Sequence, residues 1–231
     1  LLEAARKYKL ERFLHISTDE VYGSLRSGSA SESSRLNPSS PYAASKAAAD
    51  LLVLSYRHTY GLPVIIARGT NNYGRYQFPE KLIPVILTHA LNHQPIPIYG
   101  DGTNVRDWLN VEDNCRALYC LLTSGKAGEI YNVGGNCLKT NLEVVELMLK
   151  KTERPRSLIK FVADRPGHDY RYALNCEKIE QELGWQPRVD FEQGIEATVA
   201  WYGENRCWWE RIISGEYQLY YQKQYGARFK A

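Results

Sequence analysis

The sequence predicts an α/β protein built around a parallel β-sheet. Two short β-rich runs, RFLHIS at residues 12–17 and VIIA at 64–67, stand on either side of a helical pattern over residues 41–60. A strand, a long helix and a second strand make a βαβ unit, whose strands are parallel and buried on both faces. The helical segment is rich in alanine and leucine, and Gly61 and Pro63 follow it as stop signals.

The remaining elements alternate between helices and short extended pieces. Residues 1–9 have the pattern of the end of a helix, and the Ser- and Gly-rich residues 24–40 predict a loop. Beyond Tyr73, prolines punctuate the chain and the apolar periodicity predicts further elements. We expect helices at residues 80–91, 112–122, 142–150, 177–183 and 191–205, extended pieces at 96–99, 107–111 and 129–133, and short helices from Trp208 onward.

The composition is that of a globular protein and argues against several classes of function. Of 231 residues, 44% are hydrophobic and 24% are charged, and the net charge of +3 is spread along the chain. Dispersed charges argue against a nucleic-acid partner, and no apolar run approaches the ~20 residues of a membrane span. Five cysteines without a C-x-x-C pair predict buried free thiols in a reducing cytoplasm, with neither disulfides nor a metal site.

Tyr42 and Lys46 are the first candidates for chemistry. Four residues apart on the predicted helix, they share one face, and a lysine lowers the pKa of a nearby phenol so that the phenol can act as a base. Pro41 suits the first turn of that helix. A Tyr and a Lys at this spacing are usually only part of a solvated helix surface. The functional interpretation of the pair therefore depends on the strand and loop that precede it.

A second polar group directly follows the first predicted strand. The run S-T-D-E-V-Y-G places Thr18, Asp19 and Glu20 at the carboxyl end of that strand, where open parallel sheets bind ligands. Two adjacent carboxyl groups repel each other, which separates their pKa values and leaves one as an acid and the other as a base. The run is also compatible with a solvated turn or a helix N-cap.

These motifs resemble the extended short-chain dehydrogenase/reductase family and, within it, the branch of the dTDP-glucose 4,6-dehydratases. The triplet T-D-E separates that branch, since the epimerases usually carry a small residue in place of Asp19, and the decarboxylases and GDP-mannose dehydratases more often carry Ser. The resemblance covers almost the whole chain through five further runs: NNYGRYQFPEKLIP (71–84), IYGDGTNVRDW (98–108), GEIYNVGG (128–135), DRPGHDYRYA (164–173) and SGEYQLYYQKQYG (214–226).

The resemblance implies a lyase that converts dTDP-glucose to dTDP-4-keto-6-deoxyglucose through transient hydride transfer to NAD. Tyr42 would take the proton of the C4 hydroxyl, and Glu20 would remove the C5 proton. Asp19, in its protonated form, would donate to the departing C6 hydroxyl. Thr18 would orient the C4 oxygen, while Lys46 would hold the nicotinamide ribose and tune Tyr42.

The resemblance also implies a set of binding residues. Asn71 would contact the substrate and Asn72 the cofactor, although an Asn pair before Tyr-Gly is also a common turn. Asn141 would touch the nucleotide, or else cap a helix. The candidates for the diphosphate and sugar are Lys81, Arg106, Arg165 and His168, and those for the nucleobase pocket are Leu82, Pro97 and Tyr99.

The domain organisation follows from the same resemblance. We expect a Rossmann-like doubly wound parallel sheet, present here as its C-terminal portion, with a smaller mixed α/β substrate-binding domain. Residues 1–75 would be the C-terminal half of the NAD-binding domain, and residues 76–231 mainly the substrate domain, with some segments returning to the first. The Gly-rich dinucleotide fingerprint does not occur in this sequence, which implies about three βα steps, roughly a hundred residues, before Leu1.

The sequence leaves the exact reaction and the nucleotide open. Gly69 and Thr70 stand where the family usually has Cys-Ser, and we expect this difference to alter packing rather than chemistry. Thymine and uracil nucleotides are not distinguished, because UDP-glucose 4,6-dehydratases share T-D-E. The chain could also be a related epimerase or decarboxylase, or a non-catalytic truncated paralogue. The family also implies a homodimer formed through two long helices per subunit, one of them over residues 41–60.

We predict that residues 1–231 alone bind NAD⁺ weakly and are inactive, because they lack the Gly-rich loop that cradles a pyrophosphate. Isothermal titration of this chain with NAD⁺ should show no sub-micromolar binding. A clean sub-micromolar titration would contradict the prediction.

Overall fold

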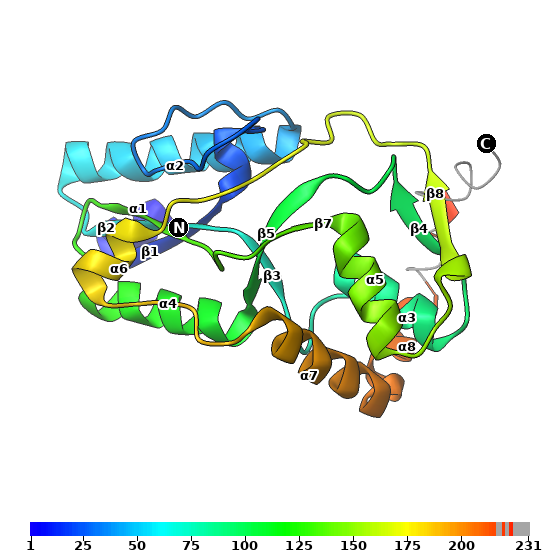
Figure 1. The fold of residues 1–231 in the computed structure, drawn as a ribbon. Coiled ribbons are helices and arrows are strands. Elements are labelled where there is room, and N and C mark those ends of the chain that lie inside the picture. Colours follow the sequence, from blue (N-terminus) through cyan, green and yellow to red (C-terminus); the bar gives the residue numbers. More distant parts are fainter. Residues whose placement is uncertain (216–218, 220–221, 224–231) are drawn as a thin grey trace. The chain divides into compact units, whose positions relative to one another are not determined.

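The computed structural model describes residues 1–215, 219 and 222–223 of the chain (Figure 1). The described chain is α/β, as the sequence predicts, and it divides into two compact units. Unit 1 consists of Leu1–Asn72, Arg106–Leu138 and Asp169–Arg188. Unit 2 consists of Tyr73–Val105, Lys139–His168 and Val189–Ala231. Most of the run at 214–226 lies outside the described residues.

The parallel sheet of unit 1 has the strand order β1-β2-β6. Its strands are β1 (Phe13–Thr18), β2 (Val64–Gly69) and β6 (Ile130–Val133). Thr18 pairs with Gly69, and Gly69 pairs in turn with Val133, so the three strands end at the same level. The polar residues that follow these strands therefore emerge along one edge of the sheet.

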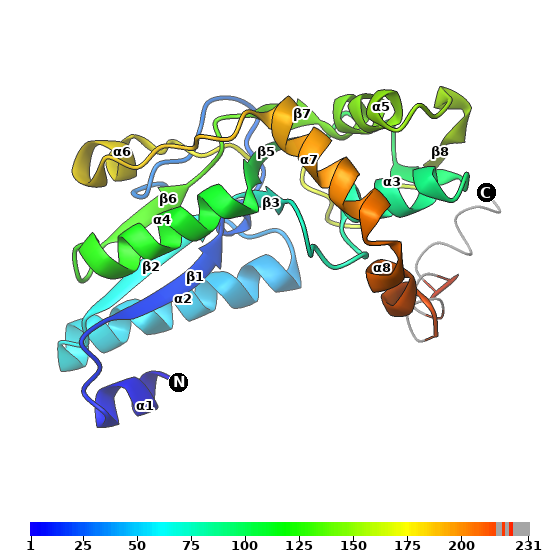
Figure 2. The ribbon, with the colours of Figure 1, turned by 90° about the horizontal axis from the view of Figure 1, so that it is seen from below.

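Helices cover both faces of this sheet (Figures 1 and 2). Helix α2 (Pro41–Tyr60) packs on one face, and α4 (Val111–Ser124) packs on the other. Ile65 and Ala67 of β2 belong to one buried cluster, while Val64 and Ile66 belong to a second. Burial on both faces explains why the strand is a continuous apolar run instead of an alternating one. Unit 1 also contains α1 (Leu2–Lys7), the 3-10 turn η1 (Asp19–Tyr22) and α6 (Glu177–Leu183).

Helix α2 has the bounds that the sequence predicts because both ends carry strong signals. The Ser40 side chain accepts a hydrogen bond from the Ala43 N–H at 3.1 Å, and Pro41 occupies the first turn. At the other end Gly61 adopts φ +68°, the left-handed conformation that closes helices and favours glycine.

Unit 2 contains a second parallel strand pair, formed by β4 (Ile96–Tyr99) and β8 (Ile159–Val162). Its further elements are α3 (Leu82–Leu91), α5 (Asn141–Lys151), η2 (Arg156–Leu158), α7 (Phe191–Glu204) and α8 (Arg206–Ile213). A three-stranded sheet has the order β3-β5-β7 and consists of β3 (Asn71–Tyr73), β5 (Val105–Asn110) and β7 (Leu138–Thr140). The sequence did not predict β3, β7 and β8. Strands β3 and β7 have only three residues, which are too few to show a period.

The cysteines depart in part from the prediction. All five are free thiols, and Cys176 is buried, but Cys115 and Cys207 are exposed. The expectation of buried thiols is wrong for these two, which lie on the solvent-facing sides of α4 and α8. Among the described helices, none is both long and apolar enough to span a membrane.

Candidate active site

The first part of the candidate site is the turn that follows β1. The strand ends at Thr18, and η1 begins with Asp19 and Glu20. The Thr18 hydroxyl accepts a hydrogen bond from the Glu20 N–H at 3.3 Å and so caps this turn. The N-cap interpretation of the sequence therefore holds for Thr18, and the same turn places both carboxyl groups at the ligand-binding edge of the sheet.

Asp19 is a buried carboxyl group, with 4% of its surface exposed. The Thr18 hydroxyl lies 3.2 Å from its Oδ1, and the Thr70 hydroxyl lies 2.9 Å from its Oδ2. Burial raises the pKa of Asp19 to about 7, and the negative charges of Glu20 and Asp107 act in the same direction. A large fraction of Asp19 therefore carries a proton near neutral pH, as a general acid requires.

Tyr42 and Lys46 approach the same strand from α2. Tyr42 lies in the first turn of the helix with 55% of its surface exposed. The Lys46 Nζ donates a hydrogen bond of 2.6 Å to the carbonyl of Ile16, two residues before the end of β1. This bond holds the lysine, one helical turn from Tyr42, against the strand that delivers Thr18.

A buried ion pair that the sequence analysis missed fixes α2 on the sheet. Asp50, one turn beyond Lys46, accepts a hydrogen bond of 2.8 Å from the Arg68 Nε of β2. Its other carboxylate oxygen lies 3.3 Å from His15 Nε2 of β1. Burial acts to raise the pKa of Asp50, but the contacts with His15, Ser17 and Arg68 hold it below its usual value.

The network continues from Arg68 across the sheet. Arg68 donates to the Tyr22 hydroxyl at 2.9 Å, and that hydroxyl donates to Asn132 Oδ1 of β6 at 2.8 Å. Its guanidinium also lies 4.9 Å above the Tyr22 ring. The available signals were an aspartate inside an Ala/Leu helix and an arginine inside an apolar strand, both of which need buried partners.

Two further predicted residues of unit 1 are already engaged with the backbone. Arg106 is buried and donates to the carbonyls of Asp169 at 2.8 Å and Tyr170 at 3.2 Å. Asn72 donates to the Thr70 carbonyl at 3.4 Å. Because Asn71–Tyr73 is strand β3, the expectation that the Asn pair forms a turn is wrong. The ligand roles predicted for Arg106, Asn71 and Asn72 stay predictions.

Unit 2 holds the other predicted binding residues. Tyr99, at the end of β4, makes an edge-to-face contact with His168 at 5.9 Å between ring centroids, and His168 Nδ1 lies 2.6 Å from Asp164 Oδ1. Lys81 Nζ lies 3.0 Å from Glu80 Oε1. Leu82 begins α3, Pro97 lies on β4, and the Arg165 N–H donates to Asp164.

Asn141 lies in the first turn of α5 without capping it. Thr140 is the N-cap, and its hydroxyl accepts from the Glu143 N–H at 3.1 Å. The capping interpretation of Asn141 is therefore wrong. Its side-chain oxygen is buried and has no hydrogen-bond partner among the described residues, so it is available to a polar ligand.

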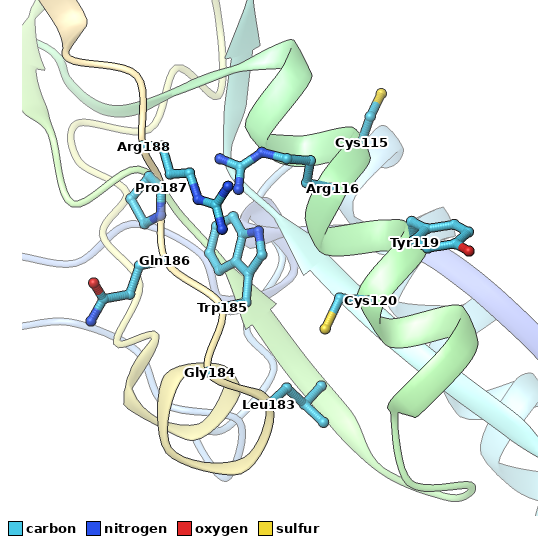
Figure 3. Close-up of a pocket in the computed structure, with 10 residues that line it drawn as sticks. All are labelled: Cys115, Arg116, Tyr119, Cys120, Leu183, Gly184, Trp185, Gln186, Pro187 and Arg188. Carbon is cyan, nitrogen blue, oxygen red and sulfur yellow. The ribbon is translucent and has the colours of Figure 1, made fainter.

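A surface hollow of about 720 Å³ lies elsewhere on unit 1 (Figure 3). Arg116 and Tyr119 line it from α4, and Trp185 and Arg188 line it from the segment after α6. None of the site residues predicted from the sequence lines this hollow, so it is separate from the polar edge of the sheet.

Comparison with known proteins defines the class. Residues 1–198 match the family model described as GDP-mannose 4,6 dehydratase, and the chain belongs to this family. A dTDP-glucose 4,6-dehydratase of Actinoplanes sp. is 54% identical over 90% of this chain and 65% of its own length. The enzyme of the same name from Escherichia coli is 48% identical over 99% of this chain and 70% of its own.

Solved structures give the same result. A dTDP-glucose 4,6-dehydratase of Streptomyces venezuelae with NAD and TYD bound matches with a TM-score of 0.91 and 51% identity over 92% of this chain and 66% of its own. A UDP-glucose 4-epimerase of Thermus thermophilus in complex with NAD matches with a TM-score of 0.84 and 32% identity over 89% of this chain and 68% of its own. The predicted resemblance and fold class are confirmed, and the chain spans 65% of the length of the Actinoplanes relative.

We predict that Asp50→Ala destabilises the protein strongly, because it leaves the Arg68 charge buried and unpaired. The expected loss in free energy of unfolding is about 3–5 kcal/mol, measured by urea denaturation. Glu146→Ala is the matched control. It breaks the exposed ion pair with Arg156, and its expected cost is below about 1 kcal/mol. Equal losses in the two variants would contradict a special role of the buried pair.

Proposed function

We propose that the protein is an NAD-dependent nucleotide-sugar 4,6-dehydratase, a lyase that acts on dTDP-glucose. The observation that carries this proposal is the pair of carboxyl groups at the end of β1. Asp19 is buried and its pKa is raised to about 7, so a substantial fraction is protonated near neutral pH, while Glu20 next to it is partly exposed. Loss of water from a 4-keto sugar needs an acid and a base side by side. The names of the relatives support the same activity.

The residues at this edge fit the nicotinamide end of the cofactor. Tyr42 is exposed, and Lys46 is held at the Ile16 carbonyl of β1. We assign Tyr42, Lys46 and Asn72 to NAD binding. These residues would hold NAD⁺, and the bound cofactor would supply a reversible hydride acceptor. The chain's own residues supply the proton transfers and the orientation.

The proton transfers divide among three side chains. Tyr42 takes the proton of the C4 hydroxyl, and the positive charge of Lys46 favours the phenolate that does so. The resulting 4-ketone acidifies the C5 hydrogen, which Glu20 removes. Asp19 protonates the departing C6 hydroxyl, and Thr18 orients the C4 oxygen. The product is a 4-keto-6-deoxy sugar nucleotide.

We assign the nucleotide-sugar contacts mainly to unit 2, and the cofactor to unit 1. We assign Leu82, Pro97 and Tyr99 to the nucleobase pocket, and His168, whose ring contacts that of Tyr99 edge to face, to the diphosphate and sugar. The buried side-chain oxygen of Asn141 offers an acceptor. Cationic side chains suit a diphosphate, and we assign this role to Lys81, Arg106 and Arg165.

The environment of Asp19 also favours a dehydratase over an epimerase. An epimerase moves a hydride at C4 and needs no acid at C6, so it would have no use for a carboxyl group kept protonated by burial. The T. thermophilus protein shares 32% identity and the fold with this chain, and it is named as an epimerase. The local chemistry, more than the fold, therefore supports our assignment.

We predict that dTDP-glucose incubated in D₂O with NAD⁺ and the full-length protein loses one water and gains one deuterium at C5, as measured by mass spectrometry. Glu20→Gln should abolish both changes. Asp19→Asn should slow water loss about 10²- to 10⁴-fold while deuterium still enters C5 of recovered substrate.

Different products in the same incubation would identify a different function. An unchanged mass with an inverted sugar stereocentre indicates an epimerase, and loss of carboxylate from a uronic acid substrate indicates a decarboxylase. Turnover of UDP-glucose alone indicates a uracil nucleotide. No reaction with any nucleotide sugar indicates a non-catalytic protein.

We further propose a cytoplasmic homodimer. The five free thiols support a reducing compartment. On α2, Leu51 and Leu52 are 59% and 55% exposed. Large apolar side chains left uncovered on a long helix favour association with a second copy.

The dimer predicts that a Leu51→Arg, Leu52→Arg double variant has half the molar mass of the unmodified protein in light scattering. Phe161→Arg, at an exposed apolar residue of β8, should leave the mass unchanged. A monomeric mass for the unmodified protein would refute the proposal.

A further inference from the structure

The hydroxyl of Thr70 contacts both the carboxyl group of Asp19 and a backbone carbonyl. Thr70 follows β2 directly and is buried, with 6% of its surface exposed. Its hydroxyl oxygen lies 2.9 Å from Asp19 Oδ2 and also 2.9 Å from the backbone carbonyl oxygen of Asp107. Its hydroxyl therefore contacts a carboxyl group of the candidate site directly. Serine and threonine both carry this hydroxyl, so the expectation that the difference from Cys-Ser alters packing rather than chemistry stays a prediction.

A single hydrogen has to serve these two contacts. A threonine hydroxyl has one hydrogen to donate and two lone pairs that accept, whereas a carbonyl oxygen can only accept. Both contacts are hydrogen bonds at once only if Thr70 donates to the Asp107 carbonyl and accepts from a protonated Asp19. When Asp19 is ionised, the same hydroxyl can turn and donate to Oδ2, at the expense of the Asp107 carbonyl.

The contact on the other carboxyl oxygen is compatible with this arrangement. Thr18 accepts a hydrogen bond from the Glu20 N–H, and its own hydrogen points to Asp19 Oδ1 at 3.2 Å. Oδ1 is then the carbonyl oxygen of the acid, and Oδ2 is the oxygen that carries the proton. The two threonines together orient the carboxyl group.

We propose that Thr70 is a positioning residue. Its hydroxyl accepts a hydrogen bond from protonated Asp19 in the resting site, and it turns to donate a hydrogen bond to the carboxylate once the proton has left Asp19. Its importance for water loss rests on the proposed dehydratase function, but the exchange of hydrogen-bond roles does not. The turn of the Thr70 hydroxyl itself breaks no covalent bond. In the step that it accompanies, the O–H bond of Asp19 and the C6–O bond of the sugar break, and the Asp19 proton forms a new O–H bond on the departing water.

The need for such a residue follows from burial. A fully buried carboxyl group without a donor for its ionised form holds its proton too tightly to be an effective acid. A hydroxyl that donates a hydrogen bond to the carboxylate lowers the pKa of the acid toward neutral pH. An acid that must lose and regain a proton in each cycle works best with a pKa in that range. Asp107 cannot take this role with its side chain, because its carboxylate oxygens accept the N–H groups of Gly135 and Cys137 at 3.0 and 2.7 Å.

The other ionisable groups that act on Asp19 are few in the described part of the chain. Glu20 on η1 and Asp107 on β5 both raise its pKa through their charges. Cys176 is a further neighbour, but burial raises the pKa of its thiol to about 12, so it stays neutral in the relevant range. The hydroxyls of Thr18 and Thr70 are the groups that lower the pKa of Asp19.

The test is the pKa of Asp19 in variants of Thr70. Infrared difference spectra of the full-length protein are recorded against pH, and the C=O band of protonated Asp19 is identified by its loss in Asp19→Asn. Thr70→Val removes the hydroxyl and keeps the shape, and we expect it to raise the pKa of Asp19 by about 1–2, the value of one hydrogen bond to a charged group. Thr70→Ser keeps the hydroxyl and should leave the pKa near that of the unmodified protein.

Thr198→Val is the matched control, because Thr198 is also buried and donates to a backbone carbonyl, that of Gly194 at 2.7 Å. It should not move the pKa of Asp19. If Thr70→Val does not fold, Thr70→Ala removes the same hydroxyl without adding a methyl group. An unchanged pKa in the variant without a hydroxyl, or the same rise in Thr70→Ser, would overturn the proposal.

Turnover gives a second, independent readout. The protonated form of Asp19 is the active acid, so activity falls as pH rises through its pKa. In Thr70→Val this fall should move to higher pH, and kcat at pH 7 should decrease about tenfold because the acid is weaker. If the unmodified protein has no dehydratase activity, the proposed function fails, and the infrared titration alone decides the exchange of hydrogen-bond roles.

Discussion

The buried ion pair between Asp50 and Arg68 is the contact on which the geometry of unit 1 depends. Two charges inside an apolar interface are costly to desolvate, and they are tolerated only when each finds the other in good geometry. Sliding α2 by one residue along the sheet would leave both unpaired. The pair therefore selects one register of the helix, and that register brings Lys46 to the Ile16 carbonyl at the end of β1.

Asp19 and Glu20 are adjacent in sequence, but their carboxyl groups lie in different environments. Glu20 is partly exposed, whereas Asp19 is enclosed between β1, Thr70 and Asp107. Burial raises the pKa of Asp19, and hydroxyl groups limit that rise. Two neighbouring carboxyl groups thus differ in burial and in pKa, and this difference supports the proposed roles of Asp19 as acid and Glu20 as base.

The family relationship and the local geometry answer different questions. Similarity to dehydratases and to an epimerase establishes a shared fold. The scaffold does not choose the reaction. In our proposal the choice depends on whether an acid stands next to the base, and this is a property of Asp19 and the groups around it.

The sequence by itself determined the fold class, the bounds of α2 and the polar turn after β1. These are local properties: helix caps, apolar runs and motif spacing are encoded within a few neighbouring residues. The strands β3 and β7 were not predictable, because three residues are too few to show a period. Tertiary structure alone decided that Asp50 meets Arg68 and that Thr70 meets Asp19, since each contact joins separate elements, and burial, which sets the charge of Asp19, is a property of the packed sheet.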